Sequence, residues 1–205
     1  MYKIFFKPFL DYFIAFSIIV IFSPIIILVS IILYFSNNGK PFFFQVRPGK
    51  NEKHFTIIKF KTMNDKVDKS GKLLSDTYRF TTIGKIIRKT SIDELPQLFN
   101  ILKGEMSLIG PRPLIPEYLP YYSSIEKRRH NVKPGITGLA QINGRNNIDW
   151  DTRLKFDTEY VDNLSFKMDC KILIQTIFNV ITSKDVSVDS TKSETYLNIE
   201  RQYKK

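Results

Sequence analysis

One long apolar stretch dominates the N-terminal part of the chain. Residues 12–35 contain no charged side chain and few polar ones. At about 1.5 Å of rise per residue, a helix of this length can cross a hydrocarbon layer of about 30 Å. Length alone therefore predicts a membrane-spanning helix.

Two residues near the middle of this stretch argue against a straight span. Pro24 has no N–H to donate to the carbonyl of Val20, and its ring opens that turn of the helix. The hydroxyl of Ser23 can satisfy the freed backbone, which matters greatly in lipid. Basic residues flank both ends, which fits two cytoplasmic ends; they are Lys3, Lys7, Lys40, Arg47, Lys50, Lys53, Lys59 and Lys61. We therefore predict that residues 1–36 form a re-entrant membrane helix broken at Ser23-Pro24.

The rest of the chain alternates between short strand-like runs and helical periodicities. Residues 42–46 and 55–60 read as strands, although the aromatic triplet 42–44 also suits a membrane interface. Apolar spacing predicts helices leading to residue 88 and over 150–161 and 166–181, the last packing on the core or lying on the membrane. The predicted fold is α+β and mainly helical, with a cytosolic catalytic domain at 37–183 and a polar, flexible tail at 184–205.

Composition limits the class of protein. A chain of 205 residues suits one domain with a real core. A net charge of +11 and a pI near 9.6 imply an anionic partner, either nucleic acid or a membrane surface with phosphorylated substrates. The single cysteine, Cys170, excludes an internal disulfide and indicates a reducing compartment. Two histidines leave no histidine-rich metal site, and no Walker A or G-x-G-x-x-G sequence is present.

Candidate chemistry concentrates between residues 88 and 112. Asp93 and Glu94 are adjacent, and Ser91 with Glu94 fits a capping box at the start of a helix. Acidic residues in a first helical turn are ordinarily structural. At a helix start, however, the dipole and nearby basic residues would favour an ionised carboxylate and the binding of phosphate.

A constrained arginine shifts the balance toward a site. Arg112 stands between Pro111 and Pro113, whose fixed φ angles stiffen the backbone. A stiff backbone suits a planar, bidentate grip on phosphate. Arg145 is a further candidate for binding phosphate or sugar. Lys59 is ambiguous, because lysines at strand ends are usually solvated, and the basic run 127–130 reads as a solvated face.

Five sequence blocks, taken in order, carry a resemblance to a known family. They are F-S-P at 22–24, Q-V-R-P-G at 45–49, I-I-K-F-K-T-M at 57–63, I-R-K-T-S-I-D-E-L-P-Q-L-F-N-I-L-K-G-E-M-S-L-I-G-P-R-P at 87–113, and V-K-P-G-I-T-G-L-A-Q-I-N-G-R-N at 132–146. No block is specific alone, but the ordered set resembles the bacterial sugar transferases, the monotopic polyprenyl-phosphate phosphoglycosyl transferases. The short members, such as bacillosamine phosphotransferases, are most similar.

The resemblance implies a ping-pong reaction on the cytoplasmic face of the inner membrane. Asp93 would attack a UDP-sugar and release UMP, and the resulting aspartyl phosphosugar would pass its sugar 1-phosphate to polyprenyl (undecaprenyl) phosphate. Glu94 would hold Mg²⁺ against the diphosphate. The resemblance places four basic residues as phosphate ligands, namely Lys59, Arg88, Arg112 and Arg145. This would be the first membrane step of glycoconjugate synthesis, with later enzymes of the same pathway as candidate partners.

Two other interpretations use the same features. A membrane glycosyltransferase that releases UDP would also need a UDP-sugar and Mg²⁺. A non-enzymatic basic membrane protein that binds anionic lipid or nucleic acid would explain the charge and the apolar stretch. It would not explain Gly-Pro-Arg-Pro beside Asp-Glu, so we expect no nucleic-acid partner. The nucleotide product, UMP or UDP, separates the first alternative from the reaction implied by the resemblance.

Overall fold

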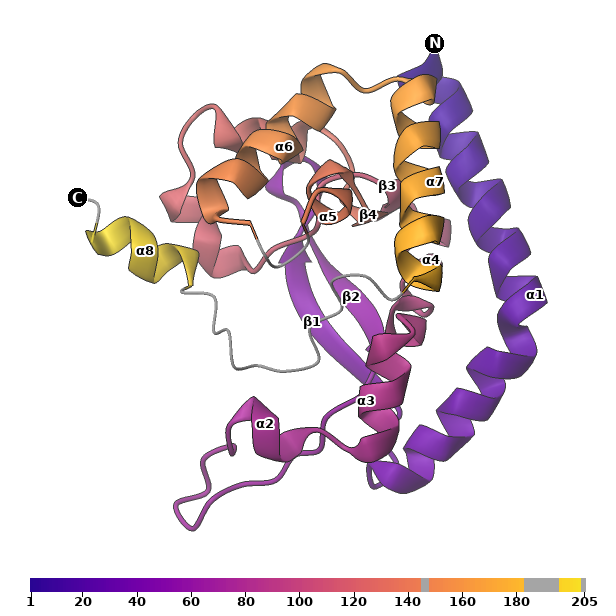
Figure 1. The fold of residues 1–205 in the computed structure, drawn as a ribbon, viewed down its shortest axis with the longest axis vertical. Helices are drawn as coiled ribbons and strands as arrows, with labels where there is room; N and C mark the ends of the chain where they lie inside the picture. The colour runs from indigo at the N-terminus through magenta and orange to yellow at the C-terminus, as the bar shows by residue number, and fades with distance from the viewer. Residues whose placement is uncertain (145–147, 183–195, 204–205) are drawn as a thin grey trace.

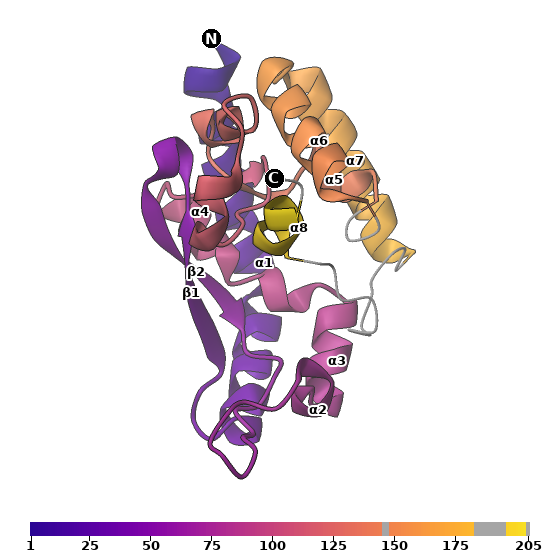
Figure 2. The same ribbon diagram turned by 90° about the vertical axis from the view of Figure 1, so that its left-hand side faces the viewer.

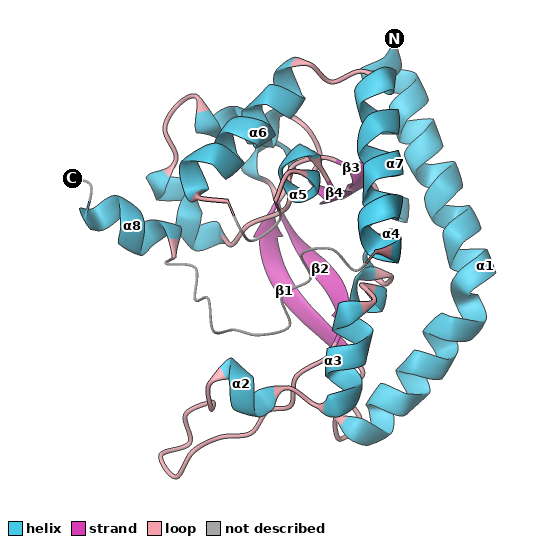
Figure 3. Ribbon diagram, viewed as in Figure 1, coloured by secondary structure: helices cyan, strands magenta, loops and turns pink. Residues whose placement is uncertain are grey.

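Helices predominate over short strands in the computed structural model, which describes residues 1–144, 148–182 and 196–203 (Figures 1 and 3). The α-helices are α1 (Lys7–Ser36), α2 (Asp76–Arg79), α3 (Thr82–Lys89), α4 (Gln97–Leu102), α5 (Leu139–Ile142), α6 (Trp150–Asp162), α7 (Phe166–Ile181) and α8 (Leu197–Tyr203). Short 3₁₀ or π turns are labelled η1 (Tyr2–Phe6), η2 (Lys50–Glu52), η3 (Ile92–Glu94), η4 (Pro116–Tyr121) and η5 (Glu126–Asn131). The predicted mixed, mainly helical class is therefore confirmed.

The described residues form two small sheets. Strands β1 (Phe42–Pro48) and β2 (His54–Phe60) pair antiparallel, with Phe42 opposite Phe60, which confirms both predicted strands. Strands β3 (Ser107–Ile109) and β4 (Gly135–Thr137) pair parallel, and no pattern in the sequence predicted them. Residues 139–142, between β4 and α6, form the short helix α5.

The long N-terminal helix runs through Pro24 without interruption. The Ser23 hydroxyl donates to the carbonyl of Val20 at 2.8 Å. It supplies the bond that proline cannot make, as expected. The predicted break in the helix at Ser23-Pro24 is therefore wrong, because the helix stays continuous and follows a curved path instead (Figure 1). By length and composition it could cross a membrane, with a mean hydropathy of 3.0.

Buried polar bonds fix the start of α1 to the rest of the protein. The Lys7 ammonium lies 2.9 Å from a carboxylate oxygen of Asp169 on α7. One helical turn later, Asp11 accepts hydrogen bonds from the Ser107 hydroxyl at 2.7 Å and from the Leu108 amide at 3.1 Å. Lys7, Asp11 and Asp169 are all buried. The charges are thus held between α1, α7 and β3.

The end of α1 returns to the same domain. Leu33 is fully buried in an apolar cluster with Phe60 and Ile87. Just past the helix, the Asn37 amide donates to the carbonyl of Lys61 at 2.6 Å. Both ends of α1 are therefore attached to the folded domain, and the helix bows away from it between them (Figure 1).

The main core lies where α4 packs between β2 and the first half of α1. Ala15, Ile57, Leu98 and Ile101 are buried together there. Asn100 on α4 is also buried and binds the backbone of β2, accepting from the Ile58 amide and donating to the Thr56 carbonyl. These bonds fix α4 against β2, and with it the segment that precedes α4.

The apolar side of α7 is exposed rather than packed on the core. Ile172 is fully buried, whereas Ile174, Ile177, Phe178 and Ile181 are each more than half exposed. In Figure 1, α7 and α1 lie along the same edge of the molecule, and the turned view in Figure 2 separates them in depth. Residues 166–181 were expected either to pack on the core or to lie on the membrane, and the exposed apolar side favours contact with a membrane.

Part of the expected C-terminal tail is folded. Leu197 is fully buried in a cluster with Tyr118, Trp150 and Leu154. Helix α8 therefore packs on η4 and α6, unlike the flexible tail expected for 184–205. Residues 183–195 and 204–205 lie outside the described residues.

Candidate functional site

The acid pair lies in a tight turn between two helices. Ser91, the second residue after α3, has a left-handed backbone (φ 57°), Asp93 and Glu94 follow in η3, and α4 begins only after Pro96. The predicted capping box is wrong, because Ser91 makes no side-chain cap bond. An N-cap residue needs an extended backbone to aim its hydroxyl at the following amides. The Glu94 carboxylate is consequently free to bind elsewhere.

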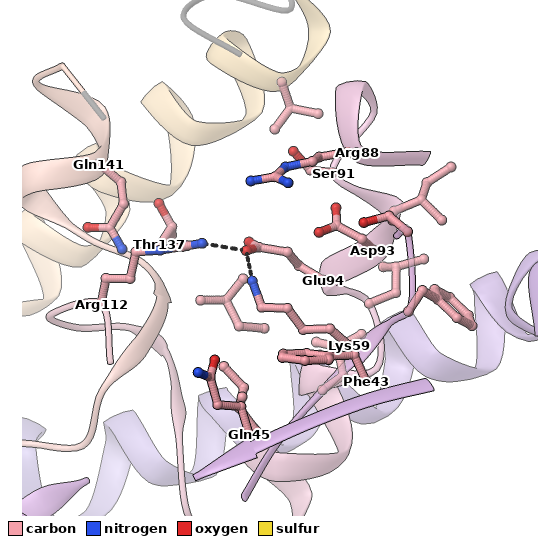
Figure 4. Close-up of a pocket in the computed structure, with 18 of the residues that line it drawn as sticks. Phe43, Gln45, Lys59, Arg88, Ser91, Asp93, Glu94, Arg112, Thr137 and Gln141 are labelled. Carbon is pink, nitrogen blue, oxygen red and sulfur yellow. Dashed lines mark hydrogen bonds and ion pairs between the residues drawn. The ribbon is translucent and has the colours of Figure 1, made fainter. Parts of the chain in front are cut away.

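Glu94 is the centre of a charge cluster. One of its oxygens, Oε1, accepts from Lys59 Nζ at 2.7 Å and from Arg112 Nη2 at 2.8 Å (Figure 4). Burial alone would raise the pKa of Glu94, but Arg112 and Lys59 outweigh it and lower that pKa well below its usual value. Burial also lowers the pKa of Lys59, although Glu94 opposes this. Glu94 is therefore ionised across the physiological range.

Asp93 differs from its neighbour. Within the described part of the chain its carboxylate has no hydrogen bond or ion pair. Burial and the charge of Glu94 raise the pKa of Asp93 to about 6, against the attraction of Lys59, Arg88 and Arg112. The basic residues favour the ionised carboxylate, as the sequence predicted, but burial and Glu94 outweigh them in setting its pKa. At neutral pH about ten ionised Asp93 side chains still exist for each protonated one.

Glycines lock the loop that carries Arg112. The Gly110 amide donates to the Thr137 carbonyl at 2.9 Å, and the Gly135 amide donates to the Pro111 carbonyl at 3.0 Å. A Cβ added to Gly110 would lie 2.5 Å from the Lys133 carbonyl oxygen, and one added to Gly135 would lie 2.1 Å from the Gly110 nitrogen. The two backbones approach too closely for any side chain at either position. The stiffness expected from the two prolines thus continues into the neighbouring strand.

A buried arginine supports Arg112 from behind. Arg129 Nη2 donates to the Arg112 carbonyl at 2.7 Å and to Asp157 at 2.8 Å. Arg129 and Asp157 are each about 2% exposed at the side chain. The prediction that residues 127–130 form a solvated face is therefore wrong for Arg129 and His130, which are both buried, although Arg128 does pair with Asp162 at the surface. The sequence could not distinguish these adjacent arginines.

The predicted site residues meet in one cleft of about 900 Å³. Five of the charged residues predicted from the sequence line it, namely Lys59, Arg88, Asp93, Glu94 and Arg112. Arg145 lies outside the described residues. The cleft is also lined by polar residues that were not singled out in the sequence, namely Gln45, Arg47, Gln141 and Arg153. The first three lie in blocks that carried the family resemblance, which was the available signal.

Another part of the cleft wall is apolar. Ile18 and Phe22 of α1 line it directly before Ser23-Pro24, and Phe43 of β1 and Leu173 and Val180 of α7 line it as well. A charged end and an apolar wall therefore share one cavity. Such a cavity can hold a phosphate group and a hydrocarbon chain side by side.

The described residues contain no group of three or more His, Cys, Asp or Glu side chains that could cage a metal. Mg²⁺ needs less, since it usually keeps several waters and takes one or two carboxylates plus substrate phosphates. Within the described residues the second oxygen of Glu94, Oε2, carries no hydrogen bond, and the neighbouring Asp93 carboxylate is unpaired. The donor set therefore fits Mg²⁺ held jointly with a diphosphate.

Comparisons with known proteins agree on one family. The profile described as bacterial sugar transferase matches residues 2–183. The uncharacterized sugar transferase EpsL of Bacillus subtilis (strain 168) is 53% identical over 165 residues, covering 80% of this chain and 82% of that protein. The undecaprenyl-phosphate galactose phosphotransferase of Salmonella typhimurium is 41% identical over 68% of this chain and 33% of its own length. The UDP-glucose:undecaprenyl-phosphate glucose-1-phosphate transferase of Klebsiella pneumoniae is 37% identical over 87% and 41% respectively.

Proposed function

Because this chain belongs to the bacterial sugar transferase family, we propose that it moves a sugar 1-phosphate from a UDP-sugar to polyprenyl phosphate. The names of the Salmonella and Klebsiella relatives describe this kind of transfer to undecaprenyl phosphate. The observation that carries the proposal is the unpaired Asp93 carboxylate beside a Glu94 that two cations hold. One carboxylate is available to react, and the other is fixed.

In the first half-reaction Asp93 is the nucleophile. A carboxylate oxygen of Asp93 forms a bond to the β-phosphorus of the UDP-sugar, and the bond from that phosphorus to the bridging oxygen breaks, so that UMP leaves. Phosphoryl transfer depends mainly on positioning and on neutralising charge. Lys59, Arg88 and Arg112 line the same cleft as Asp93 and would neutralise the diphosphate.

In the second half-reaction polyprenyl phosphate is the acceptor. A phosphate oxygen of the lipid attacks the aspartyl phosphosugar, the bond to Asp93 breaks, and a polyprenyl diphosphate-linked sugar forms. The apolar wall from α1 and α7 suits the lipid chain, while its phosphate meets the charged end of the cleft. Mg²⁺ held by Glu94 would supply further neutralisation of phosphate charge when bound.

The membrane placement that fits this reaction is monotopic, in one leaflet on the cytoplasmic face of the inner membrane. Both ends of α1 contact the catalytic domain, through Asp11 at the start and Asn37 at the end. A helix that crossed the bilayer would carry one end away from that domain. The contacts therefore support a helix that enters the bilayer and returns, as the Ser23-Pro24 pair predicts.

The test is the identity of the leaving nucleotide combined with trapping of the covalent species. The purified protein in detergent or nanodiscs is incubated with a UDP-sugar labelled at the β-phosphate, in the absence of polyprenyl phosphate. We expect one equivalent of UMP and retention of the label on denatured protein. Asp93→Asn should lose both, whereas Asp162→Asn, a surface aspartate paired with Arg128, should lose neither.

A fold measurement separates chemistry from misfolding. Because the folded protein raises the pKa of Asp93 from 3.8 to about 6, its ionised form opposes folding at neutral pH. Asp93→Asn removes that charge, so the variant should melt no lower than the parent. Release of UDP, with or without labelled protein, would indicate an ordinary glycosyltransferase and refute the proposed reaction.

A further inference from the structure

Within the part of the chain that the structure describes, one side-chain amide in the cleft makes no hydrogen bond. Gln141, on α5, lines the cleft, and both Oε1 and Nε2 are shielded from water. Neither atom has a hydrogen-bond partner within the described chain. A buried polar group without a partner destabilises the folded state, so it usually has a reason.

Nearby amides show that this protein can satisfy buried side chains of the same kind. The fully buried Asn100 uses both its oxygen and its nitrogen, and even the exposed Asn143, two residues after Gln141, donates to the Leu139 carbonyl at 2.8 Å. A side chain at Gly138 would crowd this amide, because Gln141 Oε1 lies 3.0 Å from the position that a Cβ would take there. The glycine leaves room for the amide, and the amide stays unpaired.

The position of this amide relates it to the reacting atoms. In Figure 4, Gln141 and Thr137 lie on the side of Arg112, and Asp93 lies on the other side of Glu94. Arg112 and Glu94 thus stand between the nucleophile and the amide. A molecule whose phosphate is bound by Arg112 would reach Gln141 with the group attached to that phosphate.

We propose that Gln141 is a polar ligand of the transferred sugar, with its carboxamide donating to one sugar oxygen and accepting from a sugar hydroxyl. This rests on the proposed function. A carboxamide has one acceptor and two donors, which pair with neighbouring hydroxyls. The edge of a uracil ring offers the same donor and acceptor chemistry, so the nucleotide is the other source of such a ligand.

The structure favours the sugar over the base. Flat bases stack on aromatic rings and guanidinium planes. Such a platform exists where the Arg153 guanidinium lies 4.5 Å over the Trp150 ring. Both residues line an adjoining hollow of about 250 Å³, of which Gln141 is not a lining residue. The base therefore has a better surface away from Gln141.

The test compares Gln141→Met with Gln202→Met, a control that removes an amide bonded to Tyr121 outside the cleft. UMP release is measured with UDP-glucose and UDP-galactose, and the better substrate is then used in deoxy forms that each lack one hydroxyl. We expect kcat/KM of Gln141→Met to fall about tenfold or more, with inhibition by UMP unchanged within twofold. The melting temperature should not fall, because an unpaired amide is removed. Gln202→Met should match the parent.

The deoxy sugars give the decisive comparison. In the parent, removal of the contacted hydroxyl should lower kcat/KM by a similar factor, and in Gln141→Met the same deoxy sugar and the complete sugar should react equally. Weakened UMP inhibition in Gln141→Met would assign the amide to the base and overturn the proposal, as would unchanged kcat/KM or a uniform loss for every sugar. If Gln141→Met melts early, Gln141→Asn replaces it in the same comparison. Release of UDP in place of UMP by the parent would instead refute the proposed function.

Discussion

Replacing Arg129 with methionine tests how the phosphate-binding loop is held. Arg129 and Asp157 form a buried pair at 2.8 Å, with each side chain 2% exposed. Removing the cation leaves Asp157 buried without its partner, which typically destabilises a protein by about 3–5 kcal/mol. This loss is a large part of the about 5–15 kcal/mol that stabilises a typical domain. At about 2–4 °C per kcal/mol for a chain of this size, the melting temperature should fall by about 6–20 °C.

The neighbouring Arg128 provides a matched control. It pairs with Asp162, and both side chains are about 44–45% exposed. Exposed pairs contribute about 0–1 kcal/mol, so Arg128→Met should leave melting almost unchanged. The single tryptophan, Trp150, lies on α6 with Asp157, and its fluorescence reports unfolding of that helix. Equal melting temperatures for the two variants would refute the argument.

The effect should also depend on pH. In the parent, burial raises the pKa of Asp157 and Arg129 opposes this. Without Arg129, the folded variant keeps the proton on Asp157, whereas the unfolded chain releases it above its usual pKa of 3.8. The unfolded state then binds fewer protons, so the stability of the variant falls as pH rises, by about 1.4 kcal/mol per unit. The free energy of unfolding that Arg129→Met loses relative to the parent should therefore be smaller at pH 5 than at pH 7. A loss that does not change with pH would show that the buried Asp157 charge is not its cause.

The remaining predictions concern the cleft and the membrane helix. Because burial and Glu94 raise the pKa of Asp93 to about 6, activity should fall about tenfold per unit below that pH, and a fall that begins only near pH 4 would contradict the assignment. Glu94→Gln should raise the Mg²⁺ concentration needed for half-maximal UMP release, so a loss that added Mg²⁺ cannot relieve would argue against a metal ligand. Arg112→Lys should lose about tenfold or more in kcat/KM, since an ammonium cannot copy a guanidinium fork; parental activity would exclude the clamp. Changing Ser23 and Pro24 to leucine should allow α1 to straighten, so that a cysteine introduced at the N-terminus becomes labelled from outside the cell in the variant only; outside labelling of the parent would refute a re-entrant helix.

Local sequence patterns were sufficient for most elements. Alternating or apolar runs predicted β1 and β2, and helical spacing predicted α3, α6 and α7 to within a few residues. In β2 and α6 the pattern records burial against neighbouring elements directly, whereas the apolar side of α7 gives the same helical pattern although it is exposed. The parallel pair β3 and β4 has only three residues per strand, and a period of two cannot be recognised in so short a segment.

Long-range polar contacts were beyond the sequence. Ser91 and Glu94 have the spacing of a capping box, but the preferred partners of Glu94 are 35 and 18 residues away, at Lys59 and Arg112. Spacing within a helix reports only neighbours along that helix, whereas these ion pairs depend on how α4 packs against β2. The acid pair and Arg112 could be selected as candidates, but the division of roles between an unpaired Asp93 and a paired Glu94 needed the packed structure.

The same limit applies to the charges around the membrane helix. Lys7 counts as a flanking positive charge in the sequence, yet it is buried against Asp169 and presents little charge to a membrane surface. The case for two ends on one side therefore rests less on flanking lysines than on attachment, since Asp11 is bonded to β3 and Leu33 is buried beside Phe60 of β2. A helix held at both ends by one domain cannot place those ends in different compartments without losing buried bonds or apolar contacts at one of them. For α1, tertiary contacts thus limit topology more strongly than composition does.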